Sequence, residues 1–205
     1  MGGWQRIALP AADVQLWPHW LGVAEADALF AELRQAIAWE THRIRLFGRE
    51  VASPRLSCWI GDAGAAYTYS RNRFEPQPWP MTLAALRPRI EQVCGARFNS
   101  VLANLYRDGN DAMGWHSDDE PELGAQPVIA SLSLGAERRF RLRRRRARGE
   151  PAQPGDTLEL TLPHGSLLRM AGDTQRLYKH DLPRVRHLAE ARINLTFRRV
   201  DTSPP

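Results

Sequence analysis

A histidine and an aspartate near the middle of the chain have the residue types and spacing to bind a metal. They close residues 104–118, NLYRDGNDAMGWHSD, as His116-x-Asp118. Side chains two positions apart in an extended segment point to the same side. The imidazole and the carboxylate can therefore face one metal ion, and the sequence predicts a metal site that needs a third ligand.

The third ligand has several candidates. Two histidines and one carboxylate on one face of a metal, with adjacent positions open, define the non-haem Fe(II) facial triad. Strands distant in sequence lie side by side in a barrel, so His180, at the end of a predicted strand over 176–180, can complete the triad. Spacing alone leaves the choice open among the remaining histidines: His19, His42, His164, His180 and His187.

A second pattern lies in residues 192–198, RINLTFR. On a strand, Arg192, Asn194, Thr196 and Arg198 share one face, and three apolar residues share the other. Directed into a barrel, two guanidinium groups with two more polar groups would bind a dicarboxylate through charge-assisted hydrogen bonds. The alternative is an outer strand with a solvated arginine face.

Composition is typical of a globular protein rather than a disordered one: the 205 residues are 43% hydrophobic and 25% charged. The net charge of +5 permits a nucleic-acid partner. No apolar run reaches membrane-spanning length and the first residues lack a secretory signal, so we expect a cytoplasmic protein without a membrane partner. Cys58 and Cys94 lack paired spacing and are interpreted as buried thiols.

The pattern of elements predicts an α+β fold that is mainly β. The first twenty residues are interpreted as an irregular extension, followed by an amphipathic helix over 24–39. A second helix is predicted to be capped by Thr82, kinked or restarted at Pro88 and ended by Gly95, and residues 72–80 are predicted to form a loop. From residue 98 onward, seven or so short strands suggest a jelly-roll. We expect one compact domain with residues 1–97 as extension, helices and lid, and 98–205 as core.

The metal pattern and the polar strand together resemble the AlkB family of Fe(II)/2-oxoglutarate dioxygenases. The resemblance spans roughly half the chain in matching order, over residues 98–109, 114–120, 129–140, 164–168 and 192–198. It implies a double-stranded β-helix (jelly-roll) core with flanking helices and a β-hairpin nucleotide-recognition lid. It also implies Fe(II) on His116, Asp118 and His180, with O2 as co-substrate. The residues implied to hold 2-oxoglutarate are Asn104, Tyr106, Arg192, Asn194, Thr196 and Arg198, with Arg192 and Tyr106 at the far carboxylate and Arg198 nearer the metal.

The resemblance further implies oxidative demethylation of N1-methyladenine and N3-methylcytosine in DNA, releasing formaldehyde, succinate and CO2. A base inside a duplex must be flipped out or met in a single strand. Tyr67 and Ser70 then resemble a base-recognition segment, and Asp119, followed by Glu120, would face the cationic base. Without the resemblance, Tyr67 would be an ordinary strand residue.

Two further segments suggest DNA contacts. Phe47 lies in a predicted hairpin, and one hypothesis is that it inserts as a wedge between base steps. An equally weighted alternative is that Phe47 is a core residue of the hairpin. Arg55 is a candidate contact to a phosphate or a base. In residues 137–148 the arginines alternate with Phe140 and Leu142, which predicts a hairpin with outward arginines. Such a run is usually a solvated face, but beside this site it suggests phosphate binding.

Other functions remain open at this point. The same oxygenase chemistry could act on RNA, on protein or on another substrate. An inactive, basic nucleic-acid-binding module that keeps the fold is the second alternative. A monomer is expected in each case.

Overall fold

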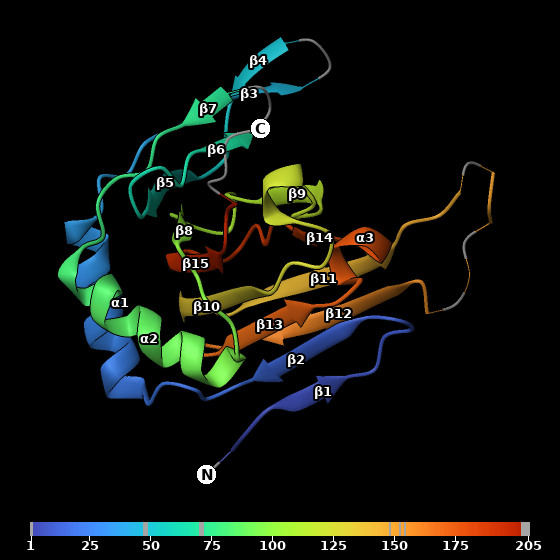
Figure 1. Cartoon of the computed structure of the whole chain (residues 1–205), viewed down its shortest axis with the longest axis horizontal. Coiled ribbons are helices and arrows are strands. Elements are labelled where there is room, and N and C mark those ends of the chain that lie inside the picture. The colour runs from blue at the N-terminus through green and yellow to red at the C-terminus, as the bar shows by residue number, and fades with distance from the viewer. Residues whose placement is uncertain are drawn as a thin grey trace.

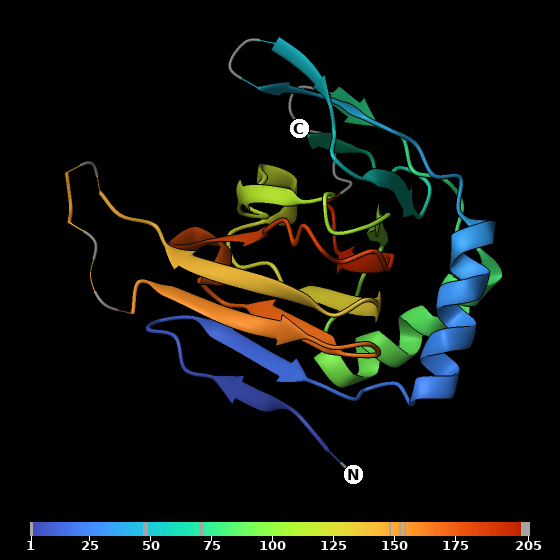
Figure 2. The ribbon, with the colours of Figure 1, turned by 180° about the vertical axis from the view of Figure 1, so that it is seen from behind.

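Two antiparallel sheets that face each other form the centre of the fold (Figures 1 and 2). The structure is a computed structural model that describes residues 2–46, 49–69, 72–147, 149–151, 153 and 155–201. For strand residues 43–46, 49–50, 67–69 and 72–74 it describes the backbone alone. The predicted mainly-β jelly-roll is confirmed.

The larger sheet has seven strands and the smaller has four. In spatial order, the larger sheet consists of β1 (Gln5–Ile7), β2 (Asp13–Trp17), β13 (Leu167–Ala171), β10 (Ile129–Gly135), β15 (Arg192–Arg198), β8 (Ser100–Tyr106) and β5 (Leu56–Gly61). The smaller sheet consists of β12 (Thr157–Leu162), β11 (Arg138–Arg144), β14 (Tyr178–Leu182) and β9 (Met113–His116). The larger sheet contains strands from residues 1–97, which were predicted as extension, helices and lid, as well as strands from residues 98–205.

Alternation along β15 determines which side of the larger sheet is polar. Ile193, Leu195 and Phe197 are fully buried in a core that includes residues of α1 (Val23–Ala36) and α2 (Met81–Cys94). Side chains of a strand alternate between faces, so the polar residues of β15 face the space between the two sheets. Since Arg192 is 1% and Arg198 3% exposed, the alternative of a solvated outer strand is wrong.

The two long helices cover the outer face of the larger sheet (Figure 2). In α1, Ala26, Leu29 and Leu33 are buried at helical spacing, and the helix ends at Ala36, before the predicted end. The predicted cap of α2 is wrong: Pro80 is the N-cap, while the Thr82 hydroxyl donates a hydrogen bond to Glu32.

The other features predicted for α2 have mixed outcomes. The helix continues through Pro88 instead of restarting there. It ends at Gly95, as predicted, and the φ angle of 63° at that residue is a conformation that glycine adopts without a steric penalty. Cys94, the last helical residue, is a buried free thiol like Cys58, which confirms the prediction for both cysteines.

Several predicted boundaries need correction. The first twenty residues are not irregular, because β1 pairs with β2 and β2 pairs with β13. Residues 72–74 form β7 rather than a loop, and the strand that carries His180 begins at Tyr178 because a one-turn helix, α3 (Thr174–Leu177), precedes it. A short 3-10 helix, η1 (Pro121–Leu123), follows β9.

Two hairpins lie where the sequence predicted a lid. They are β3 (Arg43–Leu46) with β4 (Arg49–Ala52), and β6 (Tyr67–Tyr69) with β7 (Asn72–Phe74). Both lie at the same end of the molecule, outside the two large sheets (Figure 1). Phe47 and Ser70 fall outside the described residues. Within the described part of the chain, no helix is long and apolar enough to cross a membrane.

Candidate active site

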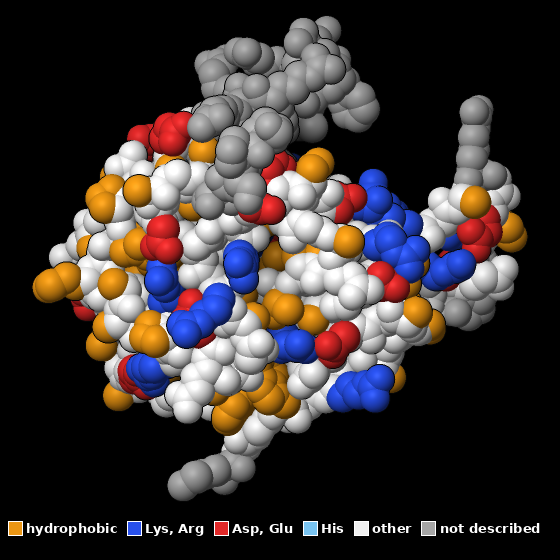
Figure 3. All heavy atoms as spheres, in the orientation of Figure 1, with side chains coloured by type: hydrophobic (Ala, Val, Ile, Leu, Met, Phe, Trp, Pro, Cys, Tyr) orange, Lys and Arg blue, Asp and Glu red, His pale blue; other side chains and the backbone are white. Residues whose placement is uncertain are grey.

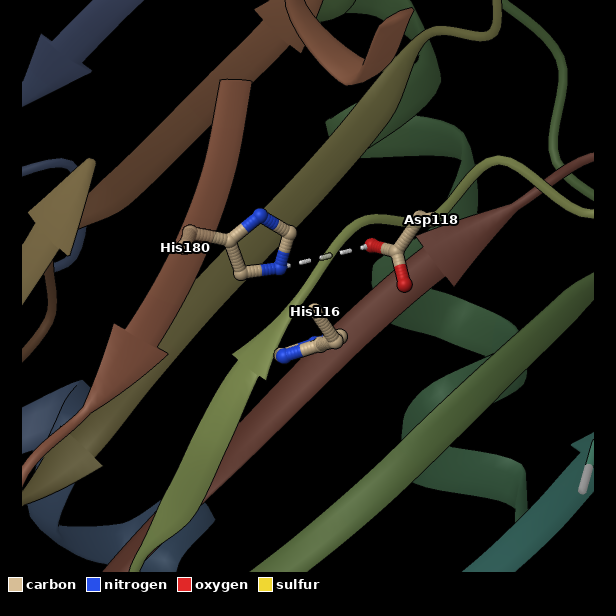
Figure 4. A group of neighbouring side chains, drawn as sticks. All are labelled: His116, Asp118 and His180. Carbon is tan, nitrogen blue, oxygen red and sulfur yellow. Dashed lines mark ion pairs between the residues drawn. The ribbon is translucent and has the colours of Figure 1, made fainter. Parts of the chain in front are cut away.

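His116, Asp118 and His180 converge between the two sheets (Figure 4). One ligand atom from each lies within 4.8 Å of the others. Strands β9 and β14 are neighbours, with His116 and His180 as direct cross-strand partners, and Asp118 follows β9 by two residues. Sheet pairing therefore fixes the distance between the imidazoles. In the described residues no other histidine joins such a group; His164, for example, contacts Asp27 and the Gly135 amide instead.

Both imidazoles are neutral and suited to metal coordination. Nδ1 of His116 lies 2.8 Å from the Gly114 carbonyl oxygen. A carbonyl can only accept, so Nδ1 carries the proton and Nε2 keeps its lone pair for a metal. Burial is the largest cause that lowers the pKa of His116, and it is also the largest cause that lowers the pKa of His180, to about 3. Phe140 stacks on the His180 ring at 5.2 Å between centroids and holds its orientation.

Asp118 is held ionised by a buried arginine. Arg198 Nη2 donates a hydrogen bond to Asp118 Oδ1 at 2.6 Å, and both side chains are 3% exposed. Burial alone would raise the pKa of Asp118, but the positive charge of Arg198, joined by that of the two histidines once acid protonates them, outweighs burial and holds the pKa at about 2. The Asp118 backbone N–H also donates to Gln175 Oε1 at 3.0 Å. The carboxylate is therefore charged and fixed in position at neutral pH.

A cavity between the sheets extends from His116, Asp118 and His180 along β8 and β15. Arg192 and Tyr106 are cross-strand partners, as are Asn194 and Asn104. The guanidinium of Arg192 lies 5.5 Å from the centre of the Tyr106 ring, at the opposite end of β15 from Arg198. All six residues predicted for a dicarboxylate line the same cavity as the triad: Asn104, Tyr106, Arg192, Asn194, Thr196 and Arg198.

Two serines of β10 support this row, and the sequence analysis gave them no role. Ser133 Oγ accepts a hydrogen bond from Arg192 Nη2 at 2.8 Å, and Ser131 Oγ accepts one from Asn194 Nδ2 at 2.7 Å. The sequence does contain a pattern that could have indicated this role: in residues 127–134, which are predicted to form a strand, Ser131 and Ser133 alternate with leucines and so share one face. Gln175 gave no comparable signal, since its contact with Asp118 depends on the pairing of distant strands.

The residues predicted to contact a base or phosphate lie in different surroundings. Arg55 is 6% exposed and donates to Asn104 Oδ1 at 2.7 Å, so it is buried next to a residue of the cavity wall rather than placed on the outer surface. Asp119 is exposed, and Arg145 Nη2 lies 2.5 Å from its Oδ2. Glu120 is half-buried. Tyr67 lies in β6, where only the backbone is described.

The arginine run follows the predicted alternation along β11. Phe140 and Leu142 are buried, and Arg139 and Arg143 are on the outer face. Arg143 lies over the Trp115 ring at 4.3 Å from its centre, whereas Arg144 pairs with Glu150 at 2.7 Å. On the face in Figure 3, basic side chains gather near the end of β11, with acidic ones beside them.

Comparison with known proteins places this geometry in a family. A sequence profile described as the 2OG-Fe(II) oxygenase superfamily matches residues 13–198. Human "Alpha-ketoglutarate-dependent dioxygenase alkB homolog 3" is 42% identical over 197 residues, which are 93% of this chain and 67% of the human protein. The chain belongs to the AlkB family of 2OG-Fe(II) oxygenases. The predicted resemblance is confirmed, and with it an Fe(II)/2-oxoglutarate-dependent dioxygenase.

Other AlkB relatives agree with this assignment. The mouse "DNA oxidative demethylase ALKBH2" is 41% identical over 183 residues, covering 87% of this chain and 77% of that protein. The chain spans about two thirds of the length of the human homolog 3 protein. A solved structure, "The structure of OsALKBH1", superposes with a TM-score of 0.64 at 16% identity, covering 96% of this chain and 99% of the other, and supports the fold alone. The AlkB cofactor set is Fe(II), with 2-oxoglutarate and O2 as co-substrates.

Proposed function

We propose that this AlkB protein removes methyl groups from N-alkylated bases in DNA, with N1-methyladenine and N3-methylcytosine as the substrate type. The observation that carries the proposal is one cavity with two neutral imidazoles and a carboxylate at one end and a buried, cationic arginine at the other. Sequence relatives at about 40% identity that are named as DNA oxidative demethylases support the choice of nucleic acid.

The donor set fits Fe(II). His116, Asp118 and His180 would hold the ion on one face, as two imidazole nitrogens and one carboxylate oxygen suit a non-haem iron site. When bound, the iron supplies oxidation of the N-methyl carbon by O2, coupled to decarboxylation of 2-oxoglutarate to succinate and CO2. The hydroxylated methyl group leaves as formaldehyde and the unmodified base remains.

The far end of the cavity fits the second carboxylate of 2-oxoglutarate. Arg192 remains cationic at neutral pH although burial lowers its pKa to about 10. Its Nε is buried without a hydrogen-bond partner among the described residues, so an anionic oxygen would find a donor there. In this assignment Arg192 and Tyr106 hold the far carboxylate and Arg198 lies at the iron end, with Asn104, Asn194 and Thr196 between them.

The base would enter beside Asp119 and the two hairpins. Methylation at adenine N1 or cytosine N3 gives the ring a positive charge, which favours the carboxylates of Asp119 and Glu120. Tyr67 and Ser70 would contact the flipped base, Phe47 would fill the space that it leaves, and Arg55 would support this region by holding Asn104. Phe47→Ala should lower repair of duplex DNA relative to single strands; equal loss on both would remove the wedge from the proposal.

A panel assay tests the function. The protein with Fe(II), 2-oxoglutarate and O2 is given methylated adenine or cytosine in single-stranded DNA, duplex DNA and RNA, and formaldehyde and succinate are measured. His116→Ala should abolish both products, whereas the exposed His187→Ala should not. Succinate without demethylation of DNA would point to RNA, protein or another substrate. No turnover of 2-oxoglutarate would point to an inactive nucleic-acid-binding module.

A further inference from the structure

Arg138 is a buried cation outside the set of residues that line the cavity. It opens β11, is 1% exposed, and is among the largest fully buried side chains. Its guanidinium donates to three backbone carbonyls: Pro183 O at 2.7 Å, Asp111 O at 2.9 Å and Asp108 O at 3.3 Å. It therefore holds the β8–β9 loop against the segment after β14.

The charge of Arg138 has no carboxylate partner among the described residues. Within the described chain its guanidinium donates hydrogen bonds only to carbonyls, and it lies 5.7 Å from the centre of the Tyr106 ring. The nearby Asp111 carboxylate bonds Arg107 instead, at 2.8 Å and 2.9 Å. Burying a charge without an opposite charge is costly, so this arrangement needs an explanation beyond loop fixing.

The Tyr106 ring lies close to two such cations. Its ring centre is 5.7 Å from the guanidinium of Arg138 and 5.5 Å from that of Arg192, and Arg192 also lacks a carboxylate partner in the described chain. The carboxylates of Asp108 and Asp111 also act on Arg138, but Asp111 is already paired with Arg107, so the two buried guanidinium groups add positive charge near this end of the cavity. This charge favours a ligand with a carboxylate here over one that ends in a methyl group.

We propose that Arg138 is a positioning residue of the co-substrate site that acts through Tyr106 and selects a dicarboxylate over a monocarboxylate 2-oxo acid. It contacts the ring outside the cavity lining, fixes the ring's position and adds its charge to that of Arg192, without touching the ligand. This inference rests on the proposed placement of the far carboxylate of 2-oxoglutarate at Arg192.

The test measures binding rather than turnover. Calorimetry with redox-inert Mn(II), without O2, gives the affinities for 2-oxoglutarate and for 2-oxopentanoate, which differ only in the terminal carboxylate. Arg138→Gln removes the charge and keeps an amide donor for the loop carbonyls. It should weaken 2-oxoglutarate binding on the order of tenfold, as expected for a unit charge about 10 Å away at an effective dielectric constant of about 20, and leave 2-oxopentanoate binding unchanged.

Three further variants complete the design. Arg138→Lys retains the charge and should retain the preference for 2-oxoglutarate, even if the protein unfolds at a lower temperature. Arg139→Gln makes the same change of net charge at an exposed neighbour and should leave both affinities unchanged. Arg192→Gln should abolish the preference; if it does not, the proposed placement of 2-oxoglutarate is wrong.

The remaining outcomes concern Arg138 alone. If Arg192→Gln abolishes the preference while Arg138→Gln leaves it intact, or weakens both acids equally, the inference is overturned and Arg138 is a loop clamp. If Arg138→Gln does not fold, the lysine variant decides: a folded Arg138→Lys protein that has lost the preference for the dicarboxylate also overturns it.

Discussion

The buried pair between Arg198 and Asp118 gives a prediction whose size follows from the structure. Replacing Arg198 by methionine retains an unbranched side chain that can occupy the space of the arginine stem, but removes the guanidinium. Asp118, which is 3% exposed, then loses the charge-assisted hydrogen bond at 2.6 Å. The metal-free protein should therefore become less stable.

The magnitude comes from the ionisation of Asp118. Its pKa is lowered from 3.8 to about 2, and one unit is worth about 1.4 kcal/mol, so the ionised carboxylate adds about 2 kcal/mol to stability. A lowered folded-state pKa means that this stability is complete above pH 3.8 and is lost as the pH falls through about 2. Without Arg198, burial would raise the pKa instead, and breaking a buried pair typically costs about 3–5 kcal/mol. We expect a loss of about 3 kcal/mol at pH 7.5.

Urea unfolding followed by circular dichroism, with EDTA and then with Mn(II), measures this loss. Mn(II) supplies positive charge beside Asp118, so it should stabilise Arg198→Met more than it stabilises the unmodified protein. Arg199→Met, at the exposed next residue, is the matched control. A loss in Arg198→Met below about 1 kcal/mol, the range of an exposed ion pair, would refute the reasoning.

Three further predictions follow from single contacts. The pKa of His180 is lowered from 6.5 to about 3, so below pH 6.5 the unfolded chain binds a proton that the folded chain does not. The metal-free protein should therefore lose up to about 1.4 kcal/mol of stability per pH unit as the pH falls towards 3. Urea unfolding measures this loss, and a flat profile would contradict the prediction. Gly109→Ala would place a methyl carbon 1.8 Å from a backbone oxygen of the facing loop and should cost about 2 kcal/mol or more in thermal unfolding, whereas Gly114→Ala meets no atom within 4 Å and should cost less. Arg55→Met leaves the Asn104 amide oxygen without its 2.7 Å donor; it should weaken 2-oxoglutarate binding in calorimetry, and unchanged binding would exclude a role in the site.

The residues of the site could be predicted from the sequence more fully than the boundaries of the helices and strands. His116-x-Asp118 and the alternation along residues 192–198 are local patterns, and both depend only on side-chain direction in extended chain. The choice of His180 required a family resemblance, because pairing of β14 with β9 joins residues 64 positions apart, from 116 to 180. Local pattern contains no information about such pairing.

The misjudged elements have a shared physical cause. Residues 5–7 and 13–17 have prolines and tryptophans nearby and lack a clear period. Their strand conformation comes from pairing rather than from local preference, because β2 hydrogen-bonds to β13 and β1 hydrogen-bonds to β2. Arg138 was given no role, although alternation places it on the same face as Phe140 and Leu142, because a charged side chain is rarely fully buried. Its burial depends on three carbonyls that come from two other segments.

The pairing of β2 with β13 has a consequence for shortened forms of the chain. Residues 13–17 supply the ladder partner of β13 over five positions, and Val14 and Leu16 are buried there. A protein that begins after Gly22 would keep every residue of the active site but would turn β13 into an exposed sheet edge with an uncovered apolar patch. Exposed edges of this kind can pair with other chains, so we expect a protein shortened in this way to self-associate more readily than the longer chain.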